Sequence, residues 1–303
     1  MAHHHHHHDS GQGDRSLFAA VVINVGLTVV QIVAGLVSGS LAMIADALHN
    51  LSDAASLVIA VWARRIARRK ADSRMTFGYA RAEVVAALIN LTVLVVVGLY
   101  LVGEAVARLV APEPVTGWIV VVVAGVALVV DLATAALTWA LAKDSVNIRA
   151  AFLHNVADAL GSVAVMVAGS LILLFGWMWV DPVATLGIAG YILWMALREM
   201  PEVVRVLMLG APVDLDAQAV LRTAETVEGV DGIHHAHLWL MDEHHAALEA
   251  HVVIEAGAWD RADTIKAAIK ARLAEAHGLR HVTLELECAA HRCDAPQRIG
   301  HAG

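Results

Sequence analysis

Two segments with the same spacing of a histidine and an aspartate carry the most distinctive chemistry of this chain. The first contains His49 and Asp53 and the second His154 and Asp158, each inside a strongly apolar stretch. Residues four apart lie on one face of an α-helix, so each segment offers an imidazole and a carboxylate to the same neighbour. If the two helices pack together, they supply two nitrogen and two oxygen ligands, a set suited to tetrahedral Zn²⁺. We therefore predict a metal site within a membrane.

The composition is typical of a protein with several membrane spans. Hydrophobic residues make up 58% of the 303 residues and charged residues only 17%, with a mean hydropathy of +0.65. The histidine run near the start is a purification tag, so residues 1–13 are excluded from the fold as tag and linker. The net charge of −8 says little about partners. We expect a lipid bilayer and divalent metal ions as partners, and no nucleic acid.

Six apolar segments reach the length of about twenty residues that a transmembrane helix needs. They predict a helical transmembrane domain over residues 14–210. Because an ionisable side chain within such a span is costly, it is a candidate for function. The six segments are 16–37, 41–63, 82–102, 117–142, 150–175 and 181–197.

The distribution of Lys and Arg predicts the orientation of the spans. These residues follow the second, fourth and sixth spans, whereas the other connections carry almost none. By the positive-inside rule, both termini then lie in the cytoplasm. An even number of spans agrees with this orientation.

Beyond the last span, the pattern changes to that of a small α+β domain. Two segments have helical spacing and three alternate as strands do, in the order αββαβ. This order predicts a cytosolic domain over residues 211–290, followed by a tail over 291–303. Such a domain is small for an independent core, so we expect dimerisation to stabilise it. The five segments are 214–227, 233–241, 246–254, 259–277 and 281–287.

The alternative to a metal site in the membrane is a polar network that holds helices together. Contacts of that kind contribute about 1 kcal/mol or less, and Asn, Ser or Thr could make them without a buried carboxylate. Two matched pairs of histidine and aspartate are better explained by a divalent cation. Since only a neutral imidazole binds metal, His49 and His154 are also expected to carry protons back, so that H⁺ is the counter-ion.

Further polar residues lie within the predicted spans. Asp46 shares the helix face of His49, where it either supports that ligand or makes a structural hydrogen bond. Asp131 adds a carboxylate in mid-span, and Asn24 and Asn90 add amides. Each of these three either lines a polar pathway or has a structural role.

A second candidate site lies in the cytosolic part, where histidines are dense. His234 and His251, from two strands, and Glu285 and Glu287, from the last strand, are expected to converge as nitrogen and oxygen ligands. Strand alternation places His234 on the face opposite to His235.

Two cysteines lie close together near the end of the chain. Cys288 and Cys293 form either a metal clip with His291 or ordinary thiols, and their spacing allows both.

Five motifs together are highly specific, and they extend over the whole chain beyond the tag. They are Asp46-Ala-Leu-His-Asn-Leu-Ser-Asp53, Thr76-Phe-Gly-Tyr-Ala-Arg-Ala-Glu83, His154-Asn-Val-Ala-Asp-Ala-Leu-Gly-Ser162, Asp181-Pro182 and Ile233-His-His-Ala-His-Leu-Trp239. With these motifs the chain resembles the cation diffusion facilitator family, and within it the zinc-exporting branch related to bacterial cobalt–zinc–cadmium resistance proteins.

The resemblance implies a homodimer with six transmembrane helices per subunit. It implies exchange of cytosolic Zn²⁺ for protons across the bacterial inner membrane, with His49, Asp53, His154 and Asp158 as the transport site. Cd²⁺ and Co²⁺ are further candidate substrates, because the same ligands accept all three ions. The resemblance also implies a cytosolic domain that binds Zn²⁺ as a regulatory ligand. One departure is His235, which stands where relatives carry an acidic residue.

Two other functions compete with transport. An intramembrane metallohydrolase needs an open coordination position and a general base, typically the Glu of His-Glu-x-x-His, and neither pair has that Glu. A membrane metal sensor would bind the ion without moving it, with the cytosolic domain as its output. We expect a secondary active transporter rather than an enzyme.

Overall fold

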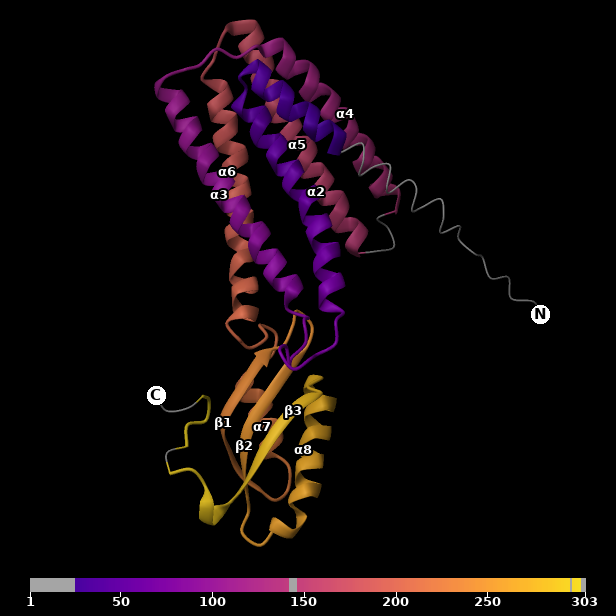
Figure 1. Cartoon of the computed structure of the whole chain (residues 1–303), viewed down its shortest axis with the longest axis vertical. Coiled ribbons are helices and arrows are strands. Elements are labelled where there is room, and N and C mark those ends of the chain that lie inside the picture. Colours follow the sequence, from indigo (N-terminus) through magenta and orange to yellow (C-terminus); the bar gives the residue numbers. More distant parts are fainter. Residues whose placement is uncertain (1–24, 142–145, 295, 301–303) are drawn as a thin grey trace, which may run out of the picture. The chain divides into compact units, whose positions relative to one another are not determined.

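Figure 1 shows a bundle of long helices and a small domain with a three-stranded sheet. The chain divides into two compact units, one made of Met1–Ile59 and Ile89–Glu199, the other of Ala60–Leu88 and Met200–Gly303. This computed structural model describes residues 25–141, 146–294 and 296–300.

Among the described residues, five helices are long and apolar enough to cross a membrane. A shorter apolar helix, Val25–Ser38, is the described part of the first predicted span. The predicted helical membrane protein is therefore confirmed. The five long helices are α2 (Leu41–Ala67), α3 (Ala82–Val110), α4 (Gly117–Leu141), α5 (Val146–Phe175) and α6 (Val180–Leu207).

Two of these helices continue well beyond the predicted end of the apolar segment. Helix α3 ends at Val110 and α6 at Leu207, although α6 contains Pro201. In α3, Glu104 and Arg108 are four residues apart and form an ion pair at 3.2 Å, a spacing that supports a helix. Hydropathy therefore locates the end of the apolar run and not the end of the helix.

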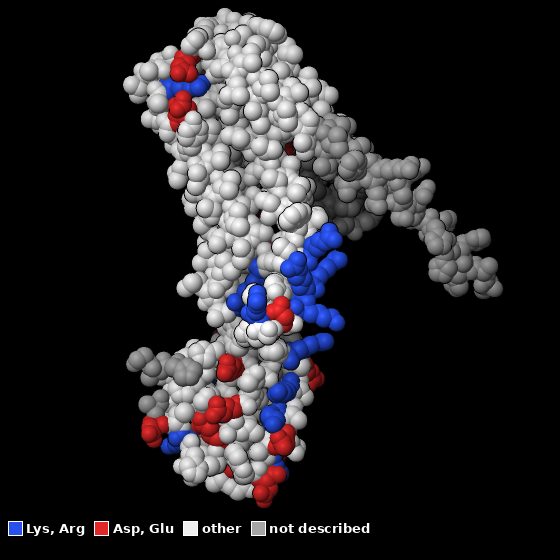
Figure 2. Space-filling model, viewed as in Figure 1, with Lys and Arg blue, Asp and Glu red and all other residues white. Residues whose placement is uncertain are grey.

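The outward surface of the long helices is apolar. Figure 2 shows almost no charge over most of the visible face of the bundle. Large side chains such as Leu99, Val129 and Leu174 are exposed on it. Contiguous apolar surface of this kind is unfavourable in water and favourable in hydrocarbon. The bundle thus has the surface of a membrane protein.

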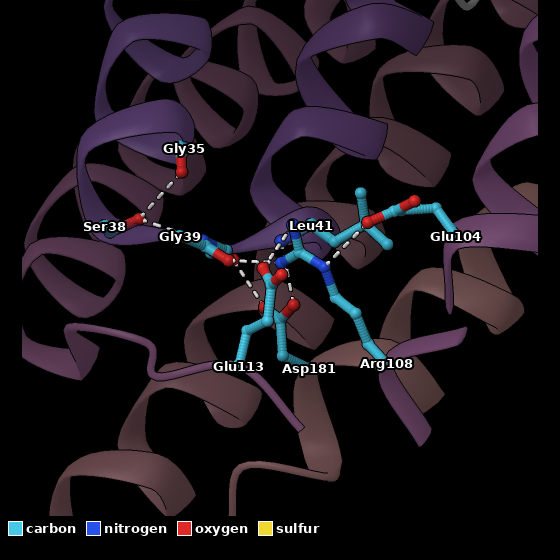
Figure 3. A network of polar contacts seen from close by, with 9 residues as sticks. Gly35, Ser38, Gly39, Leu41, Glu104, Arg108, Glu113 and Asp181 are labelled. Carbon is cyan, nitrogen blue, oxygen red and sulfur yellow. Dashed lines mark hydrogen bonds and ion pairs between the residues drawn. The ribbon is translucent and has the colours of Figure 1, made fainter. Parts of the chain in front are cut away.

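A buried carboxylate at the start of α6 anchors the start of α2. Asp181 accepts hydrogen bonds from Ser40 Oγ at 2.5 Å and from Leu41 N at 2.8 Å. The first N–H groups of a helix have no partner within it, and an anion there is favoured by the helix dipole. Asp181 therefore caps α2 from a different helix (Figure 3).

The turn before α2 is also held from α3. Arg108 donates to Gly39 O at 2.6 Å and forms ion pairs with Glu104 and Glu113 (Figure 3). Gly39 has a φ of +76°, and a Cβ there would lie 2.8 Å from Pro114 O, so the turn requires glycine. These contacts determine where α2 begins relative to α3 and α6.

The small domain has the predicted order αββαβ. Its sheet has the order β1-β2-β3, with β1 and β2 antiparallel and β2 and β3 parallel. Residues of both helices and all three strands form one hydrophobic core, including Leu221, Leu248 and Ile269. The elements are α7 (Ala217–Glu225), β1 (Val230–Leu240), β2 (Ala246–Ile254), α8 (Ala262–His277) and β3 (His281–Cys288).

Strand β1 contains a β-bulge. Its register against β2 shifts between His234 and His237, and His235 has a φ of +49°, which is uncommon for a residue other than glycine. The ring centroids of His234 and His235 lie 5.3 and 5.2 Å from that of His251. The expectation that His234 and His235 lie on opposite faces is therefore wrong, because the bulge inserts one residue into the alternation.

The segment after β3 returns to β1. His235 N donates to Gln297 O at 2.7 Å, Ala236 N to Arg298 O at 3.2 Å, and Gly300 N to Ala236 O at 3.1 Å. These residues lie beside the bulge, so the end of the chain and the bulged part of β1 form one local structure.

Replacing Asp181 by Ala is expected to destabilise the bundle, because Ser40 Oγ and Leu41 N would lose a buried acceptor at a cost of about 1–3 kcal/mol. The measurement is the midpoint of thermal unfolding in detergent, which should fall. Glu113→Ala is the control, since its carboxylate is 58% exposed and ion pairs with exposed carboxylates contribute about 0–1 kcal/mol. An equal loss in both variants would contradict the anchoring role of Asp181.

Candidate metal centres

Helices α2 and α5 bring together the four residues of the membrane site predicted from the sequence. His49 Nε2 lies 3.7 Å from both Asp53 Oδ2 and Asp158 Oδ1. His154 Nε2 lies 3.2 Å from Asp53 Oδ2 and 3.5 Å from Asp158 Oδ2. Metal–ligand bonds of about 2.0–2.2 Å give a tetrahedron whose edges are about 3.3–3.6 Å long. The four separations form a ring whose sides are close to those edges. Ligand atoms of His49, Asp53 and Asp158 all lie within 4.8 Å of one another, and His154 joins them through its contacts with the two carboxylates.

The ring is buried on one side and accessible on the other. His49 and Asp158 are buried, whereas the side chain of His154 is 44% exposed. In the described part of the chain, Asp53 Oδ2 and Asp158 Oδ1 are buried without a hydrogen bond of good geometry. Buried acceptors in that state are costly, and a bound cation would satisfy both. His154 is therefore the exposed side of the ring.

Two neighbouring helices support α2 near this ring. Tyr191 of α6 packs edge-on against His49, with ring centroids 6.1 Å apart. Ser52 Oγ donates to Asn90 Oδ1 of α3 at 3.4 Å, so Asn90 makes a contact between helices. Tyr191 was not predicted, because nothing in its spacing relates it to the histidines. Asn24 lies outside the described residues.

The two other intramembrane carboxylates make structural hydrogen bonds. Asp46, one turn before His49, accepts from Gln31 Nε2 at 2.9 Å. Asp131 of α4 accepts from Ser162 Oγ of α5 at 2.8 Å. Each bond joins two helices, which is one of the two roles that the sequence leaves open.

In the small domain, three of the predicted residues meet a fourth that was not predicted with them. Ligand atoms of His234, His251, Glu287 and Cys293 all lie within 4.8 Å of one another. Glu287 is central, since its Oε1 is 2.6 Å from His251 Nδ1 and its Oε2 is 3.2 Å from His234 Nε2. Cys293 Sγ lies 3.3 Å from Glu287 Oε1. Two imidazoles, a carboxylate and a thiol make up a zinc-type ligand set.

Glu285, the remaining predicted residue, lies at the rim of this cluster. Its Oε2 is 3.4 Å from His251 Nε2, and its side chain is 70% exposed. The two cysteines face different partners, because Cys288 Sγ contacts His291 Nδ1 at 3.1 Å. The strand pattern does not reveal Cys293, since a short 3₁₀ turn at Ala289–His291 reverses the chain before it.

The protonation of the cluster suits an incoming cation. Burial lowers the pKa of His234, so its imidazole is neutral and able to bind metal. Burial alone would raise the pKa of Glu287, but hydrogen bonds from His251 and Cys293 outweigh it and lower the pKa of this carboxyl. The hydrogen bond to Glu287 raises the pKa of the Cys293 thiol. A metal ion that binds the sulfur of Cys293 therefore has to displace the proton of this thiol.

Known proteins match both parts of the chain. Residues 17–208 match the model of the cation efflux transmembrane domain, and residues 212–288 that of the cytoplasmic domain of cation efflux proteins. The cadmium, cobalt and zinc/H(+)-K(+) antiporter of Bacillus subtilis is 34% identical over 94% of this chain and 93% of its own length. The zinc transporter ZitB of Pectobacterium atrosepticum is 35% identical over 97% and 91%.

Two further matches come from Cupriavidus metallidurans. Its metal cation efflux system protein CzcD is 34% identical over 95% of this chain and 92% of its own length. The solved metal-bound C-terminal domain of the CzcD transporter is 27% identical over 24% of this chain and 99% of that domain, with a TM-score of 0.23.

Replacing Cys293 by Ala is expected to weaken Co²⁺ binding by the cytosolic cluster and to abolish thiolate-to-cobalt charge-transfer absorption. Substitution of a group that supports a metal ligand lowers metal affinity by roughly 10- to 100-fold. Loss of the ligand itself should lower the Co²⁺ affinity by at least as much. The full chain is titrated with Asp53 and Asp158 replaced by Ala, so that the membrane ring does not contribute. Cys288→Ala is the matched control and should retain both the affinity and the absorption band.

The same titration should depend on pH. Below the raised pKa of the Cys293 thiol, one proton leaves for each ion bound, so the affinity should rise by up to about tenfold per pH unit. His234 adds little to this dependence above neutral pH, because its pKa is lowered. An affinity that stays constant as the pH rises through neutrality would contradict this role of Cys293.

Proposed function

The chain belongs to the cation efflux family, and from this premise we propose that it exports Zn²⁺ from the cytoplasm in exchange for protons. It is a transporter and not an enzyme. The observation that carries the proposal is the ring of His49, Asp53, His154 and Asp158, whose separations match the edges of a zinc tetrahedron.

The chemistry of this ring suits reversible binding. Asp53 and Asp158 neutralise the two charges of the ion, so that it can lie within an apolar bundle. His49 and His154 bind the ion only when neutral, so protons and Zn²⁺ compete for the same nitrogen atoms. A site filled by four protein ligands leaves no position for a reactive water molecule, which argues against hydrolysis.

We propose Cd²⁺ and Co²⁺ as further substrates. A ligand set of two imidazoles and two carboxylates accepts all three ions, and discrimination between them depends on geometry more than on ligand type. The relative from Bacillus subtilis is named for cadmium, cobalt and zinc, which supports this range.

The proposal includes an arrangement in the membrane. Residues 14–210 would form the transmembrane domain in a bacterial inner membrane, with both termini in the cytoplasm. The basic residues that follow α2, such as Arg64, Arg65 and Arg68, support this orientation. Residues 211–290 would form the cytosolic domain, and a second copy of the chain would complete a homodimer through its small core.

The cytosolic cluster is proposed as a regulatory Zn²⁺ site. His234, His251, Glu287 and Cys293 come from three strands and from the segment after them. An ion held by all four would fix that segment against the sheet. Occupancy would thus report cytosolic Zn²⁺ to the structure of the domain.

The test is Zn²⁺ uptake by proteoliposomes under an imposed pH gradient. We expect gradient-driven uptake by the unaltered chain, and its loss in Asp53→Ala and Asp158→Ala with the folded protein intact. Asp263→Ala, which removes an exposed carboxylate from α8, is the control and should transport normally. If the unaltered chain binds Zn²⁺ but moves none, the protein is a sensor. Uptake that survives both substitutions would show that the ion binds elsewhere.

A further inference from the structure

Asp46 and Asp131 are two buried carboxylates outside the ring of His49, Asp53, His154 and Asp158, which is called the zinc ring below. They are only 3% and 8% exposed. Both approach α5 one turn beyond Asp158: Asp131 bonds to Ser162, and Asp46 Oδ1 lies 2.7 Å from the position that a Cβ of Gly161 would take. Gly161 thus makes room for the carboxylate of Asp46. Since Ser162 is four residues after Asp158, it lies on the same face of α5.

The charge of this pair is not balanced by the protein. In the part of the chain that the structure describes, no Lys or Arg contacts either carboxylate, and their hydrogen-bond donors, Gln31 and Ser162, are neutral. The charged groups close enough to act on Asp46 are the carboxylates Asp131 and Asp158. Like charges buried together in an apolar bundle are unfavourable unless a cation joins them.

Gln31 gives independent evidence of a missing ligand. Its side chain is 1% exposed, and its amide nitrogen donates to Asp46. Its Oε1 is buried without any hydrogen-bond partner. An unsatisfied buried carbonyl is costly, and it is also a good ligand for a hard cation.

The set differs in chemistry from the zinc ring. Asp46, Asp131 and Gln31 offer oxygen atoms alone, whereas the ring includes two imidazole nitrogens. Nitrogen-containing sets suit Zn²⁺, while oxygen sets suit hard cations. The pair is therefore better suited to a small hard charge than to the exported metal.

We propose that Asp46 and Asp131, supported by Gln31, bind a monovalent cation that is exchanged for the metal ion in addition to the protons that compete with Zn²⁺ at His49 and His154. The inference rests on the proposed function as an exchanger. A proton and an alkali ion such as K⁺ share the chemistry that this pair recognises, a single positive charge held by carboxylate oxygens.

Electrostatics links the pair to the zinc ring. Asp46 precedes His49 by one helical turn, and Asp158 of the ring acts on it directly. A Zn²⁺ ion in the ring repels a cation at the pair, and departure of Zn²⁺ restores the negative field that attracts one. The two ions therefore occupy the protein in turn, which is the requirement for exchange.

The test compares Asp46→Asn and Asp131→Asn with the unaltered chain in proteoliposomes. One arm imposes a pH gradient and the other a K⁺ gradient, so the arm in which the Asn variants lose Zn²⁺ accumulation identifies the cation that the pair binds. Both variants should bind Zn²⁺ as the unaltered chain does and conduct it downhill. Their gradient-driven accumulation should fall at least about tenfold, within the usual range of coupling between two sites. Glu113→Gln, at an exposed carboxylate, is the control and should accumulate normally.

The possible results separate failure of this inference from failure of the proposed function. Normal accumulation in the Asn variants would overturn the inference. Loss of Zn²⁺ binding by the folded variants would also overturn it, because the pair would then belong to the zinc ring. An unaltered chain that moves no Zn²⁺ under either gradient would instead reject the proposed function.

A pair of serine variants tests the inference without changing any charge. Ser162→Ala removes the hydrogen bond to Asp131, so the carboxylate should hold its cation more tightly. The concentration of counter-ion that gives half-maximal Zn²⁺ accumulation should fall at least about threefold. Ser170→Ala is the matched control, because Ser170 Oγ donates to the backbone of its own helix, at Met166 O. Equal values for the two variants would overturn the role of Asp131.

Discussion

The rest of this structure depends on the high cost of negative charge inside an apolar bundle. Asp53 and Asp158 lie 3.2–3.7 Å from the ring nitrogens of two histidines, His49 and His154. Asp181 meets the same constraint differently, because it accepts hydrogen bonds at the positive end of a helix. Each carboxylate therefore has to be matched to a donor or a cation, and these matches determine how the helices pack.

The sequence predicts that His49, Asp53, His154 and Asp158 lie together because both parts of the signal are local. A spacing of four residues places His49 beside Asp53 whatever the rest of the fold does. The alternating strands and the order αββαβ are equally local. The prediction fails where a residue depends on tertiary structure: the bulge at His235 breaks the alternation, and Cys293 reaches the cluster only after a reversal of the chain. Gln31 has no sequence signal, since its role exists only beside Asp46.

The two candidate metal centres differ in what holds their side chains. His49, Asp53, His154 and Asp158 come from two helices, so a tilt of α2 against α5 would change all four separations together. In the small domain, the cross-strand pairs of His234 with His251 and of His251 with Glu285 fix the ligands in the sheet. The first arrangement suits release of an ion, and the second suits its retention.

The pairing of residues 297–300 with β1 has a consequence for the assembly of the protein. A strand edge with free N–H and C=O groups can add a strand from another molecule. Here the chain's own end covers the bulged part of that edge, and Cys293 lies between this cover and β3. Release of this segment would therefore leave backbone N–H and C=O groups of β1 without partners, at an edge where a strand of another molecule could pair.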